Sequence, residues 1–161
     1  DNAHRQFGWT DNQKTFILGN QKIHRDSIEF NPPSAATVGL FPAFEPKGDF
    51  ESWKKLIDFY NRDGFELHQY VICMGFGSIL MEFIGGIACS ALHLYSKESG
   101  LGKTTPMKAA ASIWGNPEDL VLDERDTHNS KMLRSEILHS LPLFDPRFLA
   151  LRAFSLPLCI P

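Results

Sequence analysis

Residues 95–105 of this 161-residue chain read YSKESGLGKTT, and they give the strongest indication of its fold. A phosphate chain carries dense negative charge, so its site needs backbone N–H groups that converge on the oxygens, and glycines let a loop curl in that way. Gly100 and Gly102 supply this freedom. Lys103 would then place an ammonium against the β- and γ-phosphates, and the Thr104 hydroxyl would bind Mg²⁺ at the start of the next helix. The stretch therefore predicts a site for ATP and Mg²⁺.

The loop departs from the usual phosphate-loop pattern G-x-x-x-x-G-K-[ST] at its first position, where this chain has Lys97. Its surroundings nonetheless favour phosphate binding, because residues 91–95 predict a buried strand before the loop and residues 103–114 predict a helix after it. The residues expected to contact the nucleotide are Ser99, Gly100, Leu101, Gly102, Lys103, Thr104 and Thr105.

An ATPase also needs an acidic side chain at the end of a neighbouring strand to hold Mg²⁺, commonly beside a glutamate that polarises the attacking water. Asp145 follows a predicted strand that comes one strand later in the chain than 120–122, after a second crossover, where the acidic residue of a sheet with a phosphate loop usually lies. We therefore expect Asp145 to act beside the loop lysine in catalysis and beside Thr104 in metal binding, although Pro146 stands where the glutamate is expected. Asp123 and Glu124 form the alternative acidic pair, and a charged strand end facing solvent is the simpler interpretation of them.

The order of the predicted elements indicates an α/β fold. Residues 1–48 are expected to be β-rich, because a Gly-Asn pair at 19–20 between two strand-like runs favours a hairpin. Residues 49–86 are expected to form a helical segment that begins at the N-cap Asp49. Residues 87–161 alternate strand, helix, strand, helix and strand, with strands expected at 91–95, 120–122 and 141–144 and the second helix capped by Asp126 or Thr127. This order predicts a parallel sheet around the phosphate loop.

The charge of the chain limits how it could bind nucleic acid. The formal net charge is -3, from 16 basic and 19 acidic residues, so no overall positive field attracts DNA and any contact has to be local. Lys131 and Arg134, on one face of a predicted helix, are candidates for contact with DNA or with a neighbouring subunit. Arg125 has the character of an ordinary solvated charge.

Cysteine spacing and hydropathy favour a cytoplasmic protein without a membrane partner. Cys73, Cys89 and Cys159 lie at wide spacings that match neither a disulfide framework nor a zinc site, so reduced thiols are expected. The longest apolar stretch, at 70–84, falls short of the roughly 20 residues that span a bilayer, and a buried helix is the expected structure there. No targeting peptide is visible at the start of the sequence.

Several stretches together resemble the helicase-like domain of bacteriophage and prophage replication proteins. The resemblance covers residues 7 to about 144 and is most specific over 93–117, which contains HLY at 93–95, GKTT at 102–105 and AAASIWGNP at 109–117. Such proteins are P-loop ATPases similar to superfamily 3 helicases, and they are often joined to a primase or primase-polymerase.

The resemblance implies a homo-oligomeric motor, expected to be a hexameric ring, that uses ATP to move along single-stranded DNA in the cytoplasm of a bacterial host. It implies nucleotide contacts for Lys103, Thr104 and Thr105, and a primase or polymerase domain in a longer parent chain. The family's acidic pair is replaced by FDPR at 144–147, and residues 148–161 lack its later strands, sensor residue and arginine finger. We therefore expect a core that is truncated at its C-terminal end and has an incomplete hydrolysis apparatus.

Two other functions also fit the loop. A non-enzymatic nucleotide-binding or assembly module would keep the loop for structure or regulation. A small phosphotransferase would use the same loop, but the sequence offers no recognisable lid or acceptor site.

Overall fold

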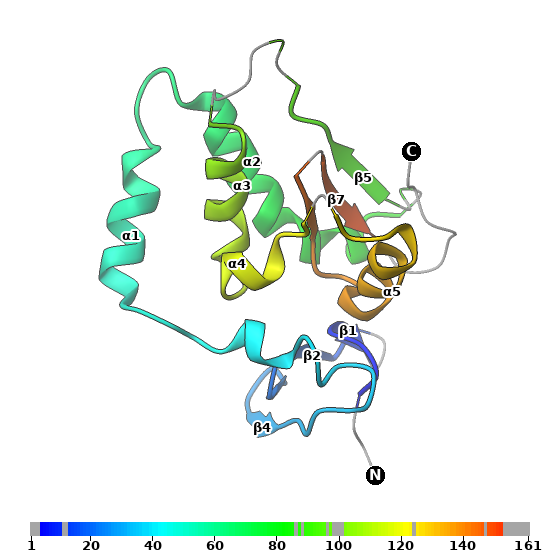
Figure 1. Cartoon of the computed structure of the whole chain (residues 1–161). Coiled ribbons are helices and arrows are strands. Elements are labelled where there is room, and N and C mark those ends of the chain that lie inside the picture. Colours follow the sequence, from blue (N-terminus) through cyan, green and yellow to red (C-terminus); the bar gives the residue numbers. More distant parts are fainter. Residues whose placement is uncertain are drawn as a thin grey trace.

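The computed structural model describes residues 4–10, 13–85, 87, 89–95, 97, 102–123, 125–146 and, for the backbone alone, 148–152. These residues form a mixed α/β arrangement, with a small sheet at one end, helices along one side and a second sheet beside them (Figure 1). No helix within these ranges combines the length and the apolar character that a membrane crossing needs.

The N-terminal part is a four-stranded antiparallel meander. Its strands lie in chain order: β1 Gly8–Thr10, β2 Thr15–Leu18, β3 Gln21–Ile23 and β4 Ile28–Phe30. The turn between β2 and β3 is the expected Gly-Asn pair, and Gly19 has a φ of 53°, which glycine adopts without the steric cost of a Cβ. The predicted hairpin is confirmed.

A short 3₁₀ helix, η1 (Phe41–Phe44), leads from the meander into helix α1 (Phe50–Phe59). Asp49 caps α1, because its Oδ2 accepts a hydrogen bond from the backbone N–H of Ser52 at 2.9 Å. The predicted N-cap is confirmed. Trp53 ties α1 to the rest of the molecule by donating from its indole N–H to Ser112 Oγ at 2.8 Å.

The cap makes part of the stability depend on pH. Hydrogen bonds from the backbone and the side chain of Ser52 lower the pKa of Asp49. A carboxyl group whose pKa is lower in the folded state stabilises that state above its unfolded pKa of about 4, and the contribution is lost as the pH falls through the folded pKa. We therefore expect Asp49→Ala to lower the free energy of unfolding at about pH 7 and to lower it much less at about pH 2.

Urea denaturation at the two pH values measures this difference. Asp49→Asn is the matched control, because asparagine keeps a capping oxygen without a titrating charge and should stay close to the unaltered chain at about pH 7. An equal loss for Asp49→Ala at both pH values would contradict the assignment.

Helices α2 (Glu66–Gly77) and α3 (Thr104–Ala111) pack against each other at small residues. A Cβ placed on Gly75 would lie 3.1 Å from the Cβ of Ala110, so the two backbones approach closely at this point. Trp114 fastens the contact by donating from its indole N–H to the carbonyl oxygen of Gly75 at 3.1 Å. This packing fixes the direction in which α3, and therefore its first turn, points.

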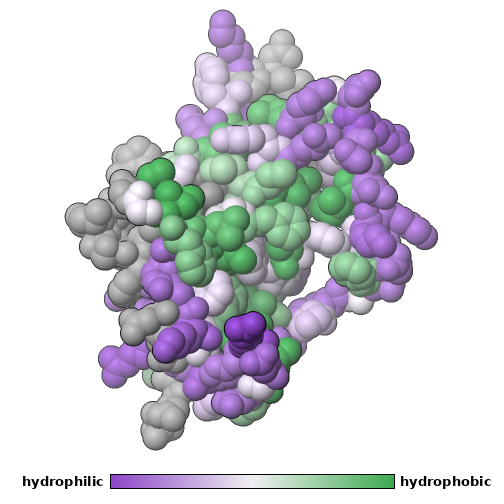
Figure 2. Space-filling model, turned by 180° about the vertical axis from the view of Figure 1, so that it is seen from behind, coloured by the Kyte–Doolittle hydropathy of each residue, from purple (hydrophilic) through white to green (hydrophobic). Residues whose placement is uncertain are grey.

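The outer side of α2 and of the 3₁₀ helix that follows it, η2 (Ser78–Phe83), is exposed. Its large apolar side chains in solvent are Leu67, Tyr70, Phe76, Leu80 and Phe83. Figure 2 shows hydrophobic side chains gathered over the middle of the face opposite to the view of Figure 1. A helix is present where the sequence predicts one. It is covered toward α3 and also by Tyr60, whose ring stacks on that of His68, whereas the side that carries these five residues is exposed.

The second sheet has the order β5-β7-β6, with β5 Cys89–Leu92, β6 Leu143–Asp145 and β7 Phe148–Arg152. Strand β7 pairs antiparallel with both neighbours, so β5 and β6 run in the same direction on either side of it. Asp145 pairs with Phe148, so β6 and β7 are joined by a two-residue connection. A connection that short permits an antiparallel hairpin but no parallel crossover.

The segment expected to be a strand at 120–122 begins instead as a short helix. Asn116 caps α4 (Pro117–Leu120) by accepting from the N–H of Glu118, and Pro117 at the first position is preorganised for a helical turn. Beyond α4, a parallel bridge joins Val121 to Phe144, and the N–H of Leu122 donates to the carbonyl oxygen of Phe144 at 2.8 Å. Among the described residues, the pairings of β5, β6 and β7 are antiparallel, and this bridge is the parallel one. A complete parallel sheet stays a prediction.

One cluster of buried apolar side chains joins the three predicted regions of the chain. Its members include Phe7, Ile17, Val71, Met107 and Phe144. Phe7 is fully buried with its ring centroid 4.5 Å from that of Phe44, and its N–H donates to the carbonyl oxygen of Ile137 at 2.8 Å. Because Ile137 belongs to α5 (His128–Leu138), the meander and the C-terminal part share one core.

The cysteines differ in their state. Cys73 is an exposed free thiol, whereas Cys89 is disulfide-bonded. The expectation of reduced thiols is therefore wrong at Cys89, and Cys159 lies outside the described residues.

Candidate functional site

The last residues of the phosphate loop form the start of α3. Gly102 has a φ of 71°, in the left-handed region that favours glycine, and its carbonyl oxygen accepts from the N–H of Thr105 at 3.1 Å. The helix begins at Thr104, one residue after the half-buried Lys103, so Thr104 and Thr105 are exposed on its open first turn. Backbone N–H groups in a first turn lack helical partners and attract anions.

Three predicted contact residues, Ser99, Gly100 and Leu101, lie outside the described residues, as does Glu124 of the alternative acidic pair. Among the described residues, Lys103 has no ion-pair partner. Its ammonium is therefore not committed to a structural salt bridge with any of them.

A pocket of about 590 Å³ opens beside the first turn of α3. Its lining comes from three parts of the chain, namely α3, the segment from α4 to the following turn, and the end of β6; the residues are Thr104, Lys108, Pro117, Glu118, Val121, Leu122, Asp123, Arg125 and Pro146. The volume falls within the range of about 300–1,000 Å³ that is usual for small-molecule sites. The parallel bridge from Val121 to Phe144 brings two of these three parts together, because it lays the segment before Asp123 alongside the strand that ends at Asp145.

Asp123 is exposed at this pocket and held by its own turn. Its Oδ1 accepts from the N–H of Arg125 at 2.8 Å, and its N–H donates to Asp126 Oδ2 at 2.9 Å. A carboxylate in a fixed turn, in a pocket that Thr104 also lines, has the chemistry of a magnesium ligand, since Mg²⁺ is usually held by one or two carboxylates together with substrate phosphates. The structure thus brings together Thr104 and the alternative acidic residue.

Asp145 has a different environment. Its side chain is fully buried, and Lys131 Nζ donates to its Oδ2 at 2.6 Å. Pro146, the next residue, lines the pocket, whereas Asp145 itself does not. The Asp145 carboxylate, which the sequence predicts to hold Mg²⁺, is therefore paired with the Lys131 ammonium and does not line the pocket.

The buried pair also corrects a second expectation. Lys131 is proposed above as a contact for DNA or a neighbouring subunit, but its side chain is only 9% exposed and is committed to Asp145, so that interpretation is wrong. Lys131 and Asp145 are 14 positions apart, and that spacing does not predict a contact between them.

Most residues of this site lie within a stretch that matches a known protein family. Residues 2–130 match the family described as a domain of unknown function, DUF927. The chain belongs to the DUF927 family. The matched residues include Thr104, Lys108, Asp123 and Arg125, and the match ends before Asp145. Comparison with curated proteins and with solved structures gives no match.

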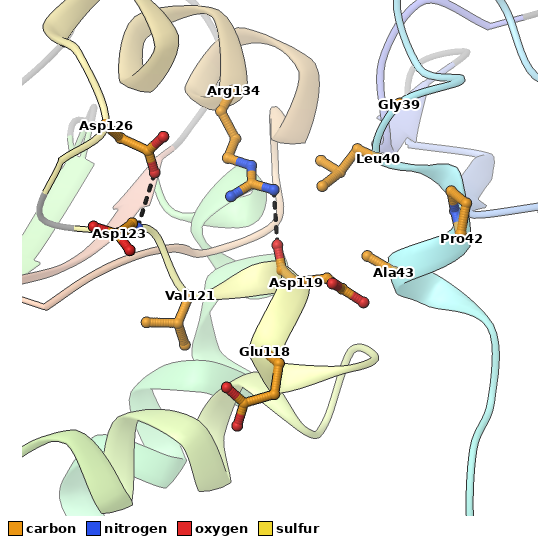
Figure 3. A pocket seen from close by; sticks show the side chains of 10 residues that line it. All are labelled: Gly39, Leu40, Pro42, Ala43, Glu118, Asp119, Val121, Asp123, Asp126 and Arg134. Carbon is orange, nitrogen blue, oxygen red and sulfur yellow. Dashed lines mark hydrogen bonds between the residues drawn. The ribbon is translucent and has the colours of Figure 1, made fainter.

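A second pocket of this DUF927 chain, of about 390 Å³, shares Glu118, Val121 and Asp123 with the first (Figure 3). Leu40, Pro42 and Ala43, from η1 and the residue before it, form one wall, and acidic residues of α4 and the following turn surround Arg134 on the other. Arg134 donates from Nη2 to the carbonyl oxygen of Asp119 at 2.7 Å. Burial lowers the pKa of Arg134, while Asp126 and Asp119 oppose this shift.

The described residues of the DUF927 chain contain no group of three or more histidine, cysteine, aspartate or glutamate side chains that could hold a metal ion by themselves. A magnesium ion that arrives with a nucleotide does not require such a group, because the phosphates supply part of its coordination. The donor set of Thr104 and Asp123 therefore fits Mg²⁺ bound together with a triphosphate better than it fits a resident metal centre.

Proposed function

We propose that this chain binds ATP together with Mg²⁺, as the nucleotide-binding core of a replicative DNA helicase of the phage type. One observation carries the nucleotide part of the proposal: the exposed first turn of α3 and the carboxylate of Asp123 line a single pocket, although they are 19 positions apart, Thr104 to Asp123, in the chain. A helix N-terminus, a hydroxyl and a carboxylate around one cavity are the groups that a magnesium-bound phosphate chain needs.

In this proposal, Lys103 and the backbone N–H groups of the first turn bind the phosphates. The Thr104 hydroxyl and the Asp123 carboxylate hold the magnesium ion and its water. Magnesium, when bound, neutralises charge that develops on the transferred phosphate. Thr105 and the loop residues before Gly102 supply further contacts, and Asp145 is a metal residue only in a state in which Lys131 has released it.

The broader role follows from the family resemblance described for the sequence. A motor of this kind forms a homo-hexameric ring, moves along single-stranded DNA and works in the cytoplasm of a bacterial host, often within a parent chain that carries a primase or polymerase domain. Each of these is a part of the proposal that rests on the resemblance rather than on the site.

A second candidate function is a nucleotide-binding or assembly module without hydrolysis. The buried pair of Lys131 and Asp145 favours it, because the pair occupies a carboxylate that an ATPase of this type uses. Pro146 after Asp145 also removes the expected position of the glutamate that polarises water.

Lys103→Ala tests the nucleotide site directly. We expect it to weaken binding of Mg-ATP by about 10- to 100-fold, because a hydrogen bond to a charged group contributes about 1.5–3 kcal/mol. Isothermal titration calorimetry measures the dissociation constant. Lys55→Ala is the matched control, since Lys55 is an exposed lysine on α1 outside the pocket, and it should leave the dissociation constant unchanged.

Hydrolysis assays with and without single-stranded DNA then separate the candidates. Turnover that DNA stimulates supports the helicase core, and binding without turnover supports the module. Turnover that ignores DNA supports a phosphotransferase. If Lys103→Ala and Lys55→Ala bind Mg-ATP as the unaltered chain does, the nucleotide proposal is wrong.

A further inference from the structure

Two cationic side chains line the pocket beside Thr104, and they differ in their partners. Lys108 Nζ lies 2.6 Å from Glu118 Oε1, so its charge is already paired within the pocket wall. Arg125 is exposed, and it forms no ion pair with any of the described residues. Of the two cationic side chains that line the pocket, Arg125 is therefore the one without a counter-ion among the described residues.

The backbone at Arg125 is held at the pocket by hydrogen bonds. Its N–H donates to Asp123 Oδ1 at 2.8 Å, and the N–H of Asp126 donates to the carbonyl oxygen of Asp123 at 3.1 Å. The return bond from the N–H of Asp123 to Asp126 Oδ2 closes the turn, as Figure 3 shows. A side chain on a closed turn is presented to a ligand at a smaller entropic cost than one on a loose loop.

Position decides which part of a nucleotide Arg125 would meet. In the proposed site, Lys103 would reach the β- and γ-phosphates, and the Thr104 hydroxyl would help to hold the magnesium ion that accompanies them. The terminal phosphate would therefore lie near Thr104, in the pocket that Asp123 and Arg125 also line. Guanidinium groups bind phosphate oxygens with two parallel hydrogen bonds, which an ammonium cannot do.

We infer that Arg125 binds the terminal phosphate of a nucleoside triphosphate and thereby lets this pocket distinguish ATP from ADP. The inference rests on the proposed nucleotide site and adds to it a residue that the sequence presents only as a solvated charge. ADP lacks the group that Arg125 would bind, so the two nucleotides should respond differently to its loss.

The test compares Mg-ATP and Mg-ADP binding by isothermal titration calorimetry in the full chain. We expect Arg125→Ala to raise the dissociation constant for ATP by about 10- to 100-fold and that for ADP by less than about threefold. Arg125→Lys should fall between the two for ATP, because it keeps the charge but loses the paired geometry. Arg25→Ala, which removes an exposed arginine of the N-terminal meander, should change neither constant.

Other outcomes separate the failure of this inference from the failure of the proposed function. If Lys103→Ala weakens both nucleotides but Arg125→Ala weakens neither, or weakens both equally, then the nucleotide site stands and the role of Arg125 is overturned. If the unaltered chain binds neither nucleotide, the proposed function and this inference both fall. A thermal unfolding midpoint for each variant shows whether a change in binding comes from the fold, and Arg125→Lys decides the matter if the alanine variant is unstable.

Discussion

Lys131→Met is expected to lower the free energy of unfolding by about 3–5 kcal/mol, which would make it one of the most damaging single changes in this chain. The ammonium of Lys131 and the carboxylate of Asp145 lie 2.6 Å apart, with side chains only 9% and 1% exposed. Taking one partner away leaves the other charge in a region from which water is excluded, and that desolvation is not compensated. Urea denaturation followed by circular dichroism measures the loss.

Two variants show whether the effect comes from the buried pair. Lys131→Met combined with Asp145→Leu should recover most of the lost stability, because an apolar pair of similar volume needs no counter-charge. Lys55→Met, at an exposed position of α1, should change the free energy of unfolding by less than about 0.5 kcal/mol. A loss below about 1 kcal/mol for Lys131→Met alone would show that the pair is not formed in a dry interior.

Phe7→Ala is expected to cost about 3–5 kcal/mol, the range measured when a buried phenylalanine is truncated and a cavity remains. Phe7 is fully buried, packs on the ring of Phe44, and belongs to the core cluster that reaches Phe144. Because the meander shares this cluster with α3 and β6, the damage should spread beyond the first strand. Trp9 of β1 and Trp114 after α3 both pack against this cluster, so tryptophan fluorescence and circular dichroism should give one coincident transition.

The control for this change is a phenylalanine of the same meander. Phe30, on β4, is 71% exposed, so Phe30→Ala should alter the free energy of unfolding by less than about 0.5 kcal/mol. Two separate transitions in Phe7→Ala, one from the meander and one from the rest, would contradict a shared core. The same result would support an independent N-terminal unit at residues 1–48.

The local features of the fold could be predicted because each depends on residues that are close in the chain. The Gly-Asn turn, the Asp49 cap and the start of a helix at Thr104 arise from backbone preferences and hydrogen bonds that span a few positions. Thr127 likewise caps α5 through Ser130, where the sequence predicts a helix start. The strand expected at 120–122 illustrates the limit, since Asn116 and Pro117 initiate a helical turn that takes Leu120.

The site depends much more on contacts between distant segments. Asp123 and Asp145 are both acidic residues after apolar runs, and the sequence favours Asp145 on grounds of strand order. The structure separates them by burial, because Asp145 meets Lys131 in the interior while Asp123 stays at the surface beside Thr104. No local pattern carries that difference, since it depends on how α5 packs against β6.

The helix that opens at the glycine-lysine-threonine turn could be read from the residues alone, because glycine favours the left-handed backbone angle at 102 and the helix depends on short-range hydrogen bonds. The charged groups that share the pocket at that turn come together through the packing of distant segments. Thr104, Asp123 and Arg125 line one pocket, and the parallel bridge from Val121 to Phe144 lays the segment before Asp123 beside β6. Which carboxylate is buried with a lysine and which one faces a ligand is therefore a property of the packed molecule.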